Sequence, residues 1–467
     1  MASAVTDQTE RHQAGARRVG WVLTRACGFA AYNQAMRFRC CFIPVLGVLL
    51  AAGFASAQPM VVASDKSNGV YQVGETVHWS LEWKGAGEPP ATRFTRKSGG
   101  FTNVGAGEVI FSNQVGRLDT RFDAPGTMLV EATWLPESRT NRAIGGAVAG
   151  AEQIRAAVPP PADFDEFWKG KLAELAKVPP NPRLEEAPGA RSGVAYWKIT
   201  LDNIRGTHIQ GQIARPEKGE KLPALLIVQW AGVYPLKKEW VTDRAAAGWL
   251  ALDIEAHDVP IDRPESFYHD LFAGELKEYW NLGNDDRDRS YFLRMYLSGY
   301  QALEYLKTRP DWNGKTLVVM GTSQGGQQTL MLAGLHPADI TAALALVPAG
   351  CDLRAPEAGR APGWPGWYFN TAGKDASKVR ETSRYFDVAN FARHIQCPVL
   401  VGVGLRDEVC APSSVLAAVN EISAPKELVV LPRSGHQDEQ GTQGAYSRRC
   451  YEVWLPALCR GAVAPVR

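Results

Sequence analysis

The fold is decided by the stretch Leu317-Val318-Val319-Met320-Gly321-Thr322-Ser323-Gln324-Gly325, which ends in a G-x-S-x-G pentapeptide. The four apolar residues before Gly321 predict a buried strand, and residues 327–335 predict a helix directly afterwards. Glycines on both sides of the serine permit a sharp strand-to-helix turn that exposes the hydroxyl of Ser323. The pentapeptide alone is a weak signal, and an idle serine is the alternative. Its strand and helix favour a nucleophile.

A serine hydroxyl needs a base, and the base needs a residue that orients it, before the oxygen becomes a strong nucleophile. Asp407 follows one late apolar run of the sequence, and His436 follows the next. The order serine, acid, histidine is the one found with this kind of turn. We therefore predict Ser323 as nucleophile, His436 as base and Asp407 as orienting acid. Glu408 is the alternative acid, and a surface position is the alternative for the histidine.

An ester hydrolase of this kind also needs two backbone N–H groups that stabilise the oxyanion. Gln324, directly after the serine, is expected to supply one of them. The second is expected from the loop Gln229-Trp230-Ala231-Gly232-Val233-Tyr234, which follows a core strand. Val233 is the predicted donor in that loop, and Gly232 is the alternative.

Apolar runs and helical patterns alternate through the last two thirds of the chain. Most runs are continuously apolar, as expected for parallel strands that are covered on both faces. Helical spacing occurs at residues 291–307 and 327–335. This alternation predicts a doubly wound, mostly parallel α/β sheet, with the predicted catalytic residues at the carboxyl ends of its strands. The apolar runs cover residues 225–228, 250–254, 317–320, 344–347, 399–403 and 428–431.

The first part of the mature chain has a β pattern instead. In Val77-His78-Trp79-Ser80-Leu81-Glu82-Trp83 large apolar residues alternate with polar ones. We predict a small immunoglobulin-like β-sandwich over residues 58–143, a linker rich in Gly, Ala and Pro at 144–161, and a catalytic domain at 162–467. The tryptophans of the quoted run are in phase with a core, although a sugar-stacking platform is the alternative. Trp134 stays open.

Residues 36–57 have the three parts of a secretory signal: Arg37 and Arg39, an apolar run over residues 41–54, and Ala55-Ser56-Ala57. Cleavage before Gln58 would release a secreted or periplasmic protein. Residues 1–35 are interpreted as an over-extended start, since Met36 stands where a signal would begin. A membrane anchor is the alternative, but the run is too short to span a bilayer, so no integral membrane span is expected.

The 467 residues are 45% apolar and 21% charged, with a net charge of +2, so we expect no attraction to nucleic acid. No zinc-type spacing or P-loop occurs, and no metal or cofactor is expected. His257-Asp258 and His269-Asp270 lack a third ligand at a plausible spacing and are interpreted as polar loop residues. Five cysteines would remain after cleavage, an odd number that leaves at least one thiol unpaired within the chain. Their pairing and the oligomeric state stay open. The five are Cys351, Cys397, Cys410, Cys450 and Cys459.

These residues resemble the acetyl xylan esterase and cephalosporin-C deacetylase family of α/β-hydrolases. The resemblance starts at Pro161-Ala162-Asp163-Phe164-Asp165-Glu166-Phe167-Trp168 and runs to the C-terminal helix. Its most specific parts are Gly321-Thr322-Ser323-Gln324-Gly325-Gly326 and Cys397-Pro398-Val399-Leu400-Val401-Gly402-Val403-Gly404-Leu405-Arg406-Asp407. It implies the same three catalytic residues, a second oxyanion donor at Val233 where the family usually has Tyr, and deacetylation of xylan, xylo-oligosaccharides and small acetates without a metal or cofactor.

Two departures from the family pattern leave the substrate open. The usual Arg-Gly-Gln after the fourth core strand is Glu255-Ala256-His257 here, and the usual His-Glu is His436-Gln437. Glu255 is therefore a candidate substrate-binding residue. Trp364 and Trp367, in an aromatic loop before the predicted acid, are two more candidates, because they could stack on a sugar ring; a self-packed loop is the alternative.

The expected function is removal of acetyl or other short acyl groups from plant-type polysaccharides or oligosaccharides, which would be the protein's partners. A serine peptidase of the prolyl-oligopeptidase type is an alternative with the same order of catalytic residues, although its N-terminal module is usually much larger. A non-catalytic polysaccharide-binding protein is the other alternative, and an intact set of serine, acid and histidine speaks against it.

Overall fold

The computed structural model describes residues 59–134, 141–189 and 191–467. All of these residues belong to one compact unit. The predicted signal peptide at 36–57 and the cleavage point before Gln58 lie outside the described residues. Within the described part, no helix combines the length and the apolar character that crossing a bilayer requires.

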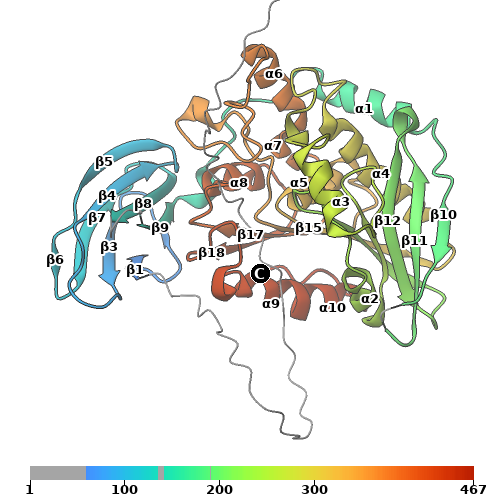
Figure 1. The fold of residues 1–467 in the computed structure, drawn as a ribbon, viewed down its shortest axis with the longest axis horizontal. Helices are drawn as coiled ribbons and strands as arrows, with labels where there is room; N and C mark the ends of the chain where they lie inside the picture. The colour runs from blue at the N-terminus through green and yellow to red at the C-terminus, as the bar shows by residue number, and fades with distance from the viewer. Residues whose placement is uncertain (1–58, 135–140, 190) are drawn as a thin grey trace, which may run out of the picture. The chain divides into compact units, whose positions relative to one another are not determined.

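The N-terminal part consists of two β-sheets that share one core (Figure 1). Trp79 and Trp134 are both buried in that core, and the indole N–H of Trp79 donates to the hydroxyl of Thr120 at 2.9 Å. Neither tryptophan can therefore serve as a sugar-stacking platform. The first sheet contains β1 (Met60–Ser64), β3 (Thr76–Trp83), β7 (Val115–Arg121) and β6 (Phe111–Ser112), and the second contains β2 (Val70–Tyr71), β9 (Asn141–Ala149), β8 (Gly126–Trp134), β4 (Thr92–Ser98) and β5 (Thr102–Glu108).

The predicted linker is wrong for its first six residues, because β9 continues to Ala149. Small residues there allow close packing rather than flexibility. A Cβ on Gly145 would lie 2.7 Å from Val62, and one on Gly146 would lie 2.1 Å from the carbonyl oxygen of Leu405. Glycines and alanines in a tightly packed strand have the composition of a linker, and the sequence alone does not show which residues pack against them.

The rest of the chain forms a nine-stranded sheet in which six neighbouring strands, β13 to β18, are parallel and β10, β11 and β12 are antiparallel. The predicted mostly parallel sheet is thus confirmed, while the antiparallel strands at one edge were not anticipated. Across the sheet the strands are β10 (Arg183–Glu186), β11 (Val194–Asp202), β12 (His208–Pro216), β14 (Leu250–Ile254), β13 (Leu222–Val228), β15 (Trp312–Thr322), β16 (Ala342–Leu346), β17 (Val399–Gly404) and β18 (Lys426–Leu431).

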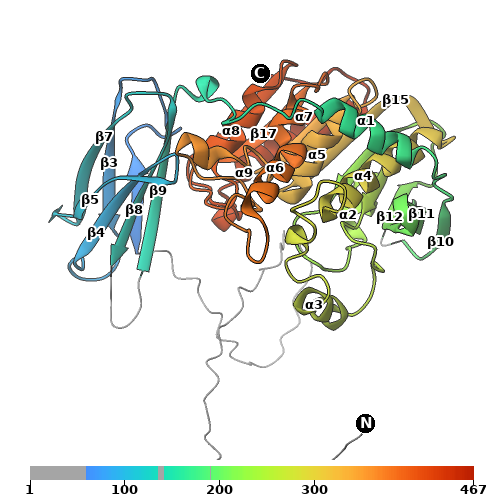
Figure 2. The same cartoon turned by 90° about the horizontal axis from the view of Figure 1, so that it is seen from above.

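Helices cover both faces of this sheet, as Figures 1 and 2 show. Consecutive strand residues belong to different cores: Leu225 packs in one cluster and Leu226 in the other, which explains why the strands are apolar throughout. One face packs against α1 (Phe164–Leu175), α3 (Glu265–Ala273), α4 (Tyr291–Thr308), α5 (Gln324–Leu335), α6 (Ala376–Phe386), α7 (Val388–Ala392) and α8 (Pro412–Asn420). The other face packs against α2 (Glu239–Ala246), α9 (Gly444–Arg448), a π-helix (Arg449–Trp454) and α10 (Leu455–Cys459).

Short 3₁₀ turns complete the secondary structure, and the turn at Tyr279–Asn281 lies next to the site described below. The five cysteines whose pairing was left open are all free thiols, and all but Cys459 are buried. The other short turns are Ala151–Gln153, Ile204–Gly206, Ala355–Ala358 and Glu439–Gly441.

Candidate active site

Ser323 is the single residue between the end of β15 and the start of α5, in a turn whose geometry requires the flanking glycines. Its own backbone has φ 58 and ψ −119, a conformation that costs a non-glycine residue energy. A Cβ on Gly321 would lie 2.5 Å from the backbone of Gly325, and a Cβ on Gly325 would lie 2.2 Å from the carbonyl oxygen of Val228. Only hydrogen fits at either position. The strand–turn–helix predicted from the pentapeptide is therefore present.

The three residues predicted to act together form one hydrogen-bonded chain. The Oγ of Ser323 lies 2.9 Å from Nε2 of His436, and Nδ1 of that histidine lies 2.9 Å from Oδ2 of Asp407. Because an ionised carboxylate only accepts hydrogen bonds, Nδ1 carries the ring proton and Nε2 is free to accept one from the serine. Such an arrangement is able to remove the proton of a hydroxyl as that oxygen attacks.

Asp407 is fully buried, and the backbone around it holds its carboxyl group. Oδ1 accepts hydrogen bonds from the N–H groups of Val409 and Cys410, both at 2.8 Å, which leaves Oδ2 for His436. Glu408, the alternative acid, is exposed and pairs instead with Arg142 at 2.5 Å. The structure thus brings Asp407 and not Glu408 to the histidine.

The N–H of Val233, the predicted second oxyanion donor, belongs to the Gly232–Val233 peptide, and the carbonyl of that peptide is held by a hydrogen bond. His257 lies 2.8 Å through Nε2 from the carbonyl oxygen of Gly232, and 2.7 Å through Nδ1 from the hydroxyl of Tyr291. Burial lowers the pKa of His257 to about 3, so the ring is neutral and donates to the carbonyl from Nε2. In a trans peptide the C=O and the following N–H point in opposite directions. The N–H of Val233 therefore points away from His257.

One hydroxyl connects this loop to the start of α5. The OH of Tyr279 donates to Oε1 of Gln324 at 2.5 Å and accepts from the N–H of Gly232 at 3.3 Å. The same buried tyrosine thus contacts the side chain of Gln324 and the residue directly before Val233. Sequence reasoning missed Tyr279, which lies far from either in the chain, and interpreted His257 as a mere polar loop residue. The position of His257 directly after the end of β14 was the available signal.

Two of the three candidate substrate residues are wrong. Trp367 is 0% exposed, donates its indole N–H to the carbonyl of Trp280 at 2.9 Å and stacks on Phe292, so no sugar can reach its ring. Glu255 is 1% exposed, and burial raises the pKa of its carboxyl group well above its usual range. Both oxygens of this carboxyl group are sealed in the interior, so they cannot contact a bound sugar. Trp364 is half-buried, and its role stays a prediction.

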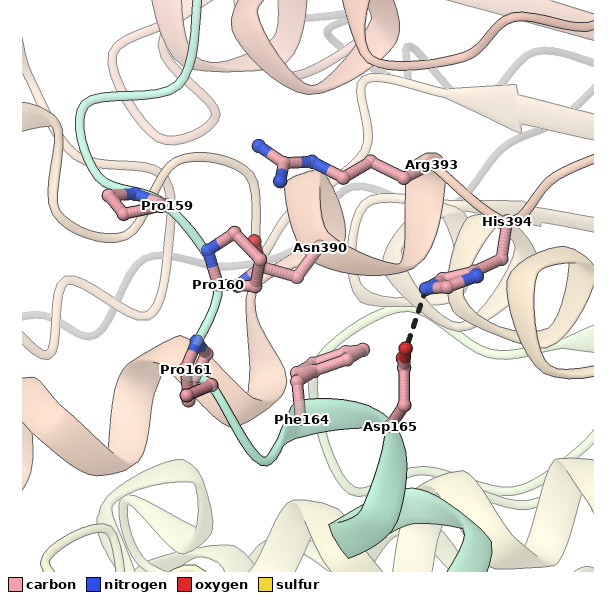
Figure 3. Close-up of a pocket in the computed structure, with 9 residues that line it drawn as sticks. Pro159, Pro160, Pro161, Phe164, Asp165, Asn390, Arg393 and His394 are labelled. Carbon is pink, nitrogen blue, oxygen red and sulfur yellow. Dashed lines mark ion pairs between the residues drawn. The ribbon is translucent and has the colours of Figure 1, made fainter.

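A hollow of about 490 Å³ lies on another part of the surface, and none of the three predicted catalytic residues lines it. Figure 3 shows its walls, where His394 faces Asp165 beside the ring of Phe164. The two side chains are 3.2 Å apart, and the proline run that precedes α1 closes the opposite wall. Nothing in this hollow resembles the chemistry around Ser323, so we do not assign it a catalytic role.

Comparison with known proteins agrees with this architecture. The sequence profile of a family described as acetyl xylan esterase (AXE1) matches residues 151–451. Acetyl esterase Axe7A of Xylanibacter ruminicola is 34% identical over 281 residues, which make up 59% of this chain and 63% of that protein. The chain thus matches less than two thirds of that relative's length.

Two solved acetyl xylan esterases have the same fold. The enzyme from Paenibacillus sp. R4 superimposes with a TM-score of 0.55 at 24% identity, over 64% of this chain and 96% of the other. The enzyme from Thermoanaerobacterium sp. JW/SL YS485 gives a TM-score of 0.54 at 24% identity, over 66% and 97% of the two chains. The predicted α/β-hydrolase fold is confirmed by these likenesses, and the profile match covers most of the chain. The protein is therefore a member of the acetyl xylan esterase family.

Proposed function

We propose that the protein is a serine esterase that removes acetyl or other short acyl groups from carbohydrates. The observation that carries the proposal is the unbroken chain of two 2.9 Å contacts from Ser323 through His436 to Asp407. Family membership supports ester hydrolysis as the reaction, and the acetyl groups named for the relatives support a short acyl chain. No metal or cofactor takes part in any step below.

In the first half of the reaction, Ser323 Oγ attacks the acyl carbon while its proton passes to Nε2 of His436. The carbonyl oxygen becomes an oxyanion that the N–H groups of Gln324 and Val233 stabilise. Asp407 keeps the imidazole in the required tautomer and stabilises its positive charge. When the tetrahedral intermediate collapses, His436 returns the proton to the sugar oxygen, the ester bond breaks and the free hydroxyl leaves.

In the second half, water attacks the acyl group that is now bound to Ser323. His436 takes one proton from this water, and a second tetrahedral intermediate forms with the same stabilisation of its oxyanion. Its collapse transfers the proton back to Ser323 and releases the carboxylic acid. Each residue returns to its starting state, so the cycle consumes only ester and water.

Export of the protein is part of the same proposal and rests on the sequence alone. The basic start, the apolar run over residues 41–54 and Ala55-Ser56-Ala57 favour cleavage before Gln58 and release into the periplasm or the medium. Polymeric substrates such as acetylated xylan are found outside cells, which fits an exported enzyme. N-terminal sequencing of the protein from its native host would show the cleavage point directly.

The decisive experiment compares Ser323→Ala with Ser383→Ala, a change at a buried serine whose hydroxyl donates to the carbonyl oxygen of Arg380 at 2.7 Å. The substrates are acetylated xylan, aryl esters of increasing acyl length and a proline-aryl amide. We expect Ser323→Ala to lose about 10⁴-fold or more in kcat with unchanged unfolding, and Ser383→Ala to stay active. Retained activity in Ser323→Ala would refute the mechanism. Amide cleavage by the wild type would indicate a peptidase, and binding of xylan without turnover a non-catalytic protein.

A further inference from the structure

We propose that the N-terminal sheets are a working part of the active site, because they position the segment that carries Asp407. The inference rests on the proposed function of that carboxylate. Segment 405–408 follows β17, and in Figures 1 and 2 β9 lies on the side of the N-terminal sheets that faces β17 and β18. The two parts meet next to the predicted acid.

Three of the four residues in this segment touch the N-terminal sheets. Leu405 packs against β9, where a Cβ on Gly146 would lie only 2.1 Å from its carbonyl oxygen. The guanidinium of Arg406 donates from Nη2 to the carbonyl oxygen of Val62 in β1 at 3.2 Å. Glu408 pairs with Arg142 of β9 at 2.5 Å. Asp407 is the remaining residue, and it faces the opposite way, toward His436.

On its other side the segment contacts the part of the chain that carries the histidine. The N–H of Leu405 donates to the carbonyl of Leu431 at 3.1 Å, and the N–H of Arg406 donates to that of Ser434 at 3.0 Å. Ser434 precedes His436 by two residues. The acid segment is therefore held between the N-terminal sheets and the histidine loop, and a displacement at β9 reaches the contact between Asp407 and His436.

Close packing, rather than charge, sets this position. The side chains of Arg142 and Glu408 are each 39% exposed, and an ion pair with that exposure contributes little. The contact between Gly146 and Leu405 is different, because it involves backbone atoms that have no other rotamer to adopt. Trp79 and Trp134 are buried in the N-terminal core, so neither ring is available to stack on a sugar.

The test is Gly146→Ala, with Gly126→Ala in β8 of the same sheet as its matched control. Neither glycine has a positive φ, and a Cβ on Gly126 meets nothing within 4 Å, so only the first variant pushes on the acid segment. We expect Gly146→Ala to lower kcat on an aryl acetate about 10- to 100-fold with KM changed less than about twofold, since a misplacement near 1 Å costs up to about 100-fold. Gly126→Ala should match the wild type.

Thermal unfolding and activity are measured on both full-length variants. An unchanged kcat in folded Gly146→Ala would overturn the inference, and so would a rise in KM for acetylated xylan without any loss of kcat on the aryl acetate, which would indicate a substrate-binding module. If Gly146→Ala does not fold, Leu405→Ala decides, because it removes the side chain that packs against Gly69 and Gly146: a several-fold loss of kcat at constant KM supports the inference, and an unchanged kcat overturns it. An inactive wild type, or an active Ser323→Ala, would instead refute the proposed function.

Discussion

Replacing Tyr279 by Phe removes a hydroxyl that connects the side chain of Gln324 to the residue directly before Val233. Oε1 of Gln324 loses a hydrogen bond of 2.5 Å, and the N–H of Gly232 loses one of 3.3 Å. Each buried group left without a partner costs about 1–3 kcal/mol of unfolding free energy. Loss of an oxyanion donor costs about 10²- to 10³-fold in kcat, and a donor that is loosened rather than removed should cost about 10- to 100-fold. KM should change little, because the oxyanion forms only during the reaction.

The matched control is Tyr268→Phe, since Tyr268 is another buried tyrosine with the same kinds of partner. Its hydroxyl donates to the carbonyl of Pro260 at 2.5 Å and accepts from the N–H of Arg263 at 3.0 Å. Both variants should lose similar amounts of unfolding free energy in urea titrations, while only Tyr279→Phe should lose kcat in steady-state assays on an aryl acetate. Equal kcat values for the two variants would refute the proposed role of the loop.

Three other variants test separate parts of the structure. Asp407→Asn should lower kcat about 10⁴-fold with an unchanged unfolding transition, because the carboxylate that keeps the proton of His436 on Nδ1 is lost; steady-state kinetics would check this. Burial raises the pKa of Asp253 from its ordinary 3.8 to about 7, so this group makes the unfolding free energy fall, by roughly 4 kcal/mol, as pH rises from about 4 to 7. Asp253→Asn should remove that fall in urea titrations across this range. Gly325→Ala should lower the free energy of unfolding by about 1–3 kcal/mol or more in urea titrations, because the added Cβ would meet the carbonyl oxygen of Val228. Gly170→Ala in α1 is the control and should change it little, because a Cβ there meets nothing within 4 Å.

The interpretation of Gly146 shows how composition misleads when neighbours are unknown. Gly and Ala are frequent in linkers, and residues 144–149 were predicted as one for that reason. The same residues lie in a strand whose backbone is pressed against Val62 and Leu405. Small size was the relevant property, and the partner that demands it lies more than 250 positions away in the chain.

A similar limit applies to the aromatic and acidic candidates. Trp367 and Glu255 were predicted to contact substrate from their residue types and from their places beside core strands. Both are buried, and neither type nor place could reveal this, because burial depends on which other segments fold over a loop. The contacts of Tyr279 and His257 with Gly232 were missed for the same reason.

The sequence by itself determined the parallel part of the sheet, the sharp turn at Ser323 and Asp407 and His436 as the candidate partners of that serine. Those features are local: continuous apolar runs, glycines that permit a turn, and polar residues directly after strands. Only the tertiary structure decided what supports the candidate site, namely the tyrosine that contacts Gln324 and Gly232 and the strand that packs against residues 405–408. These supports are contacts between parts of the chain far apart in sequence, and the physical reason is that close packing depends on shape in three dimensions, which no spacing along the chain records.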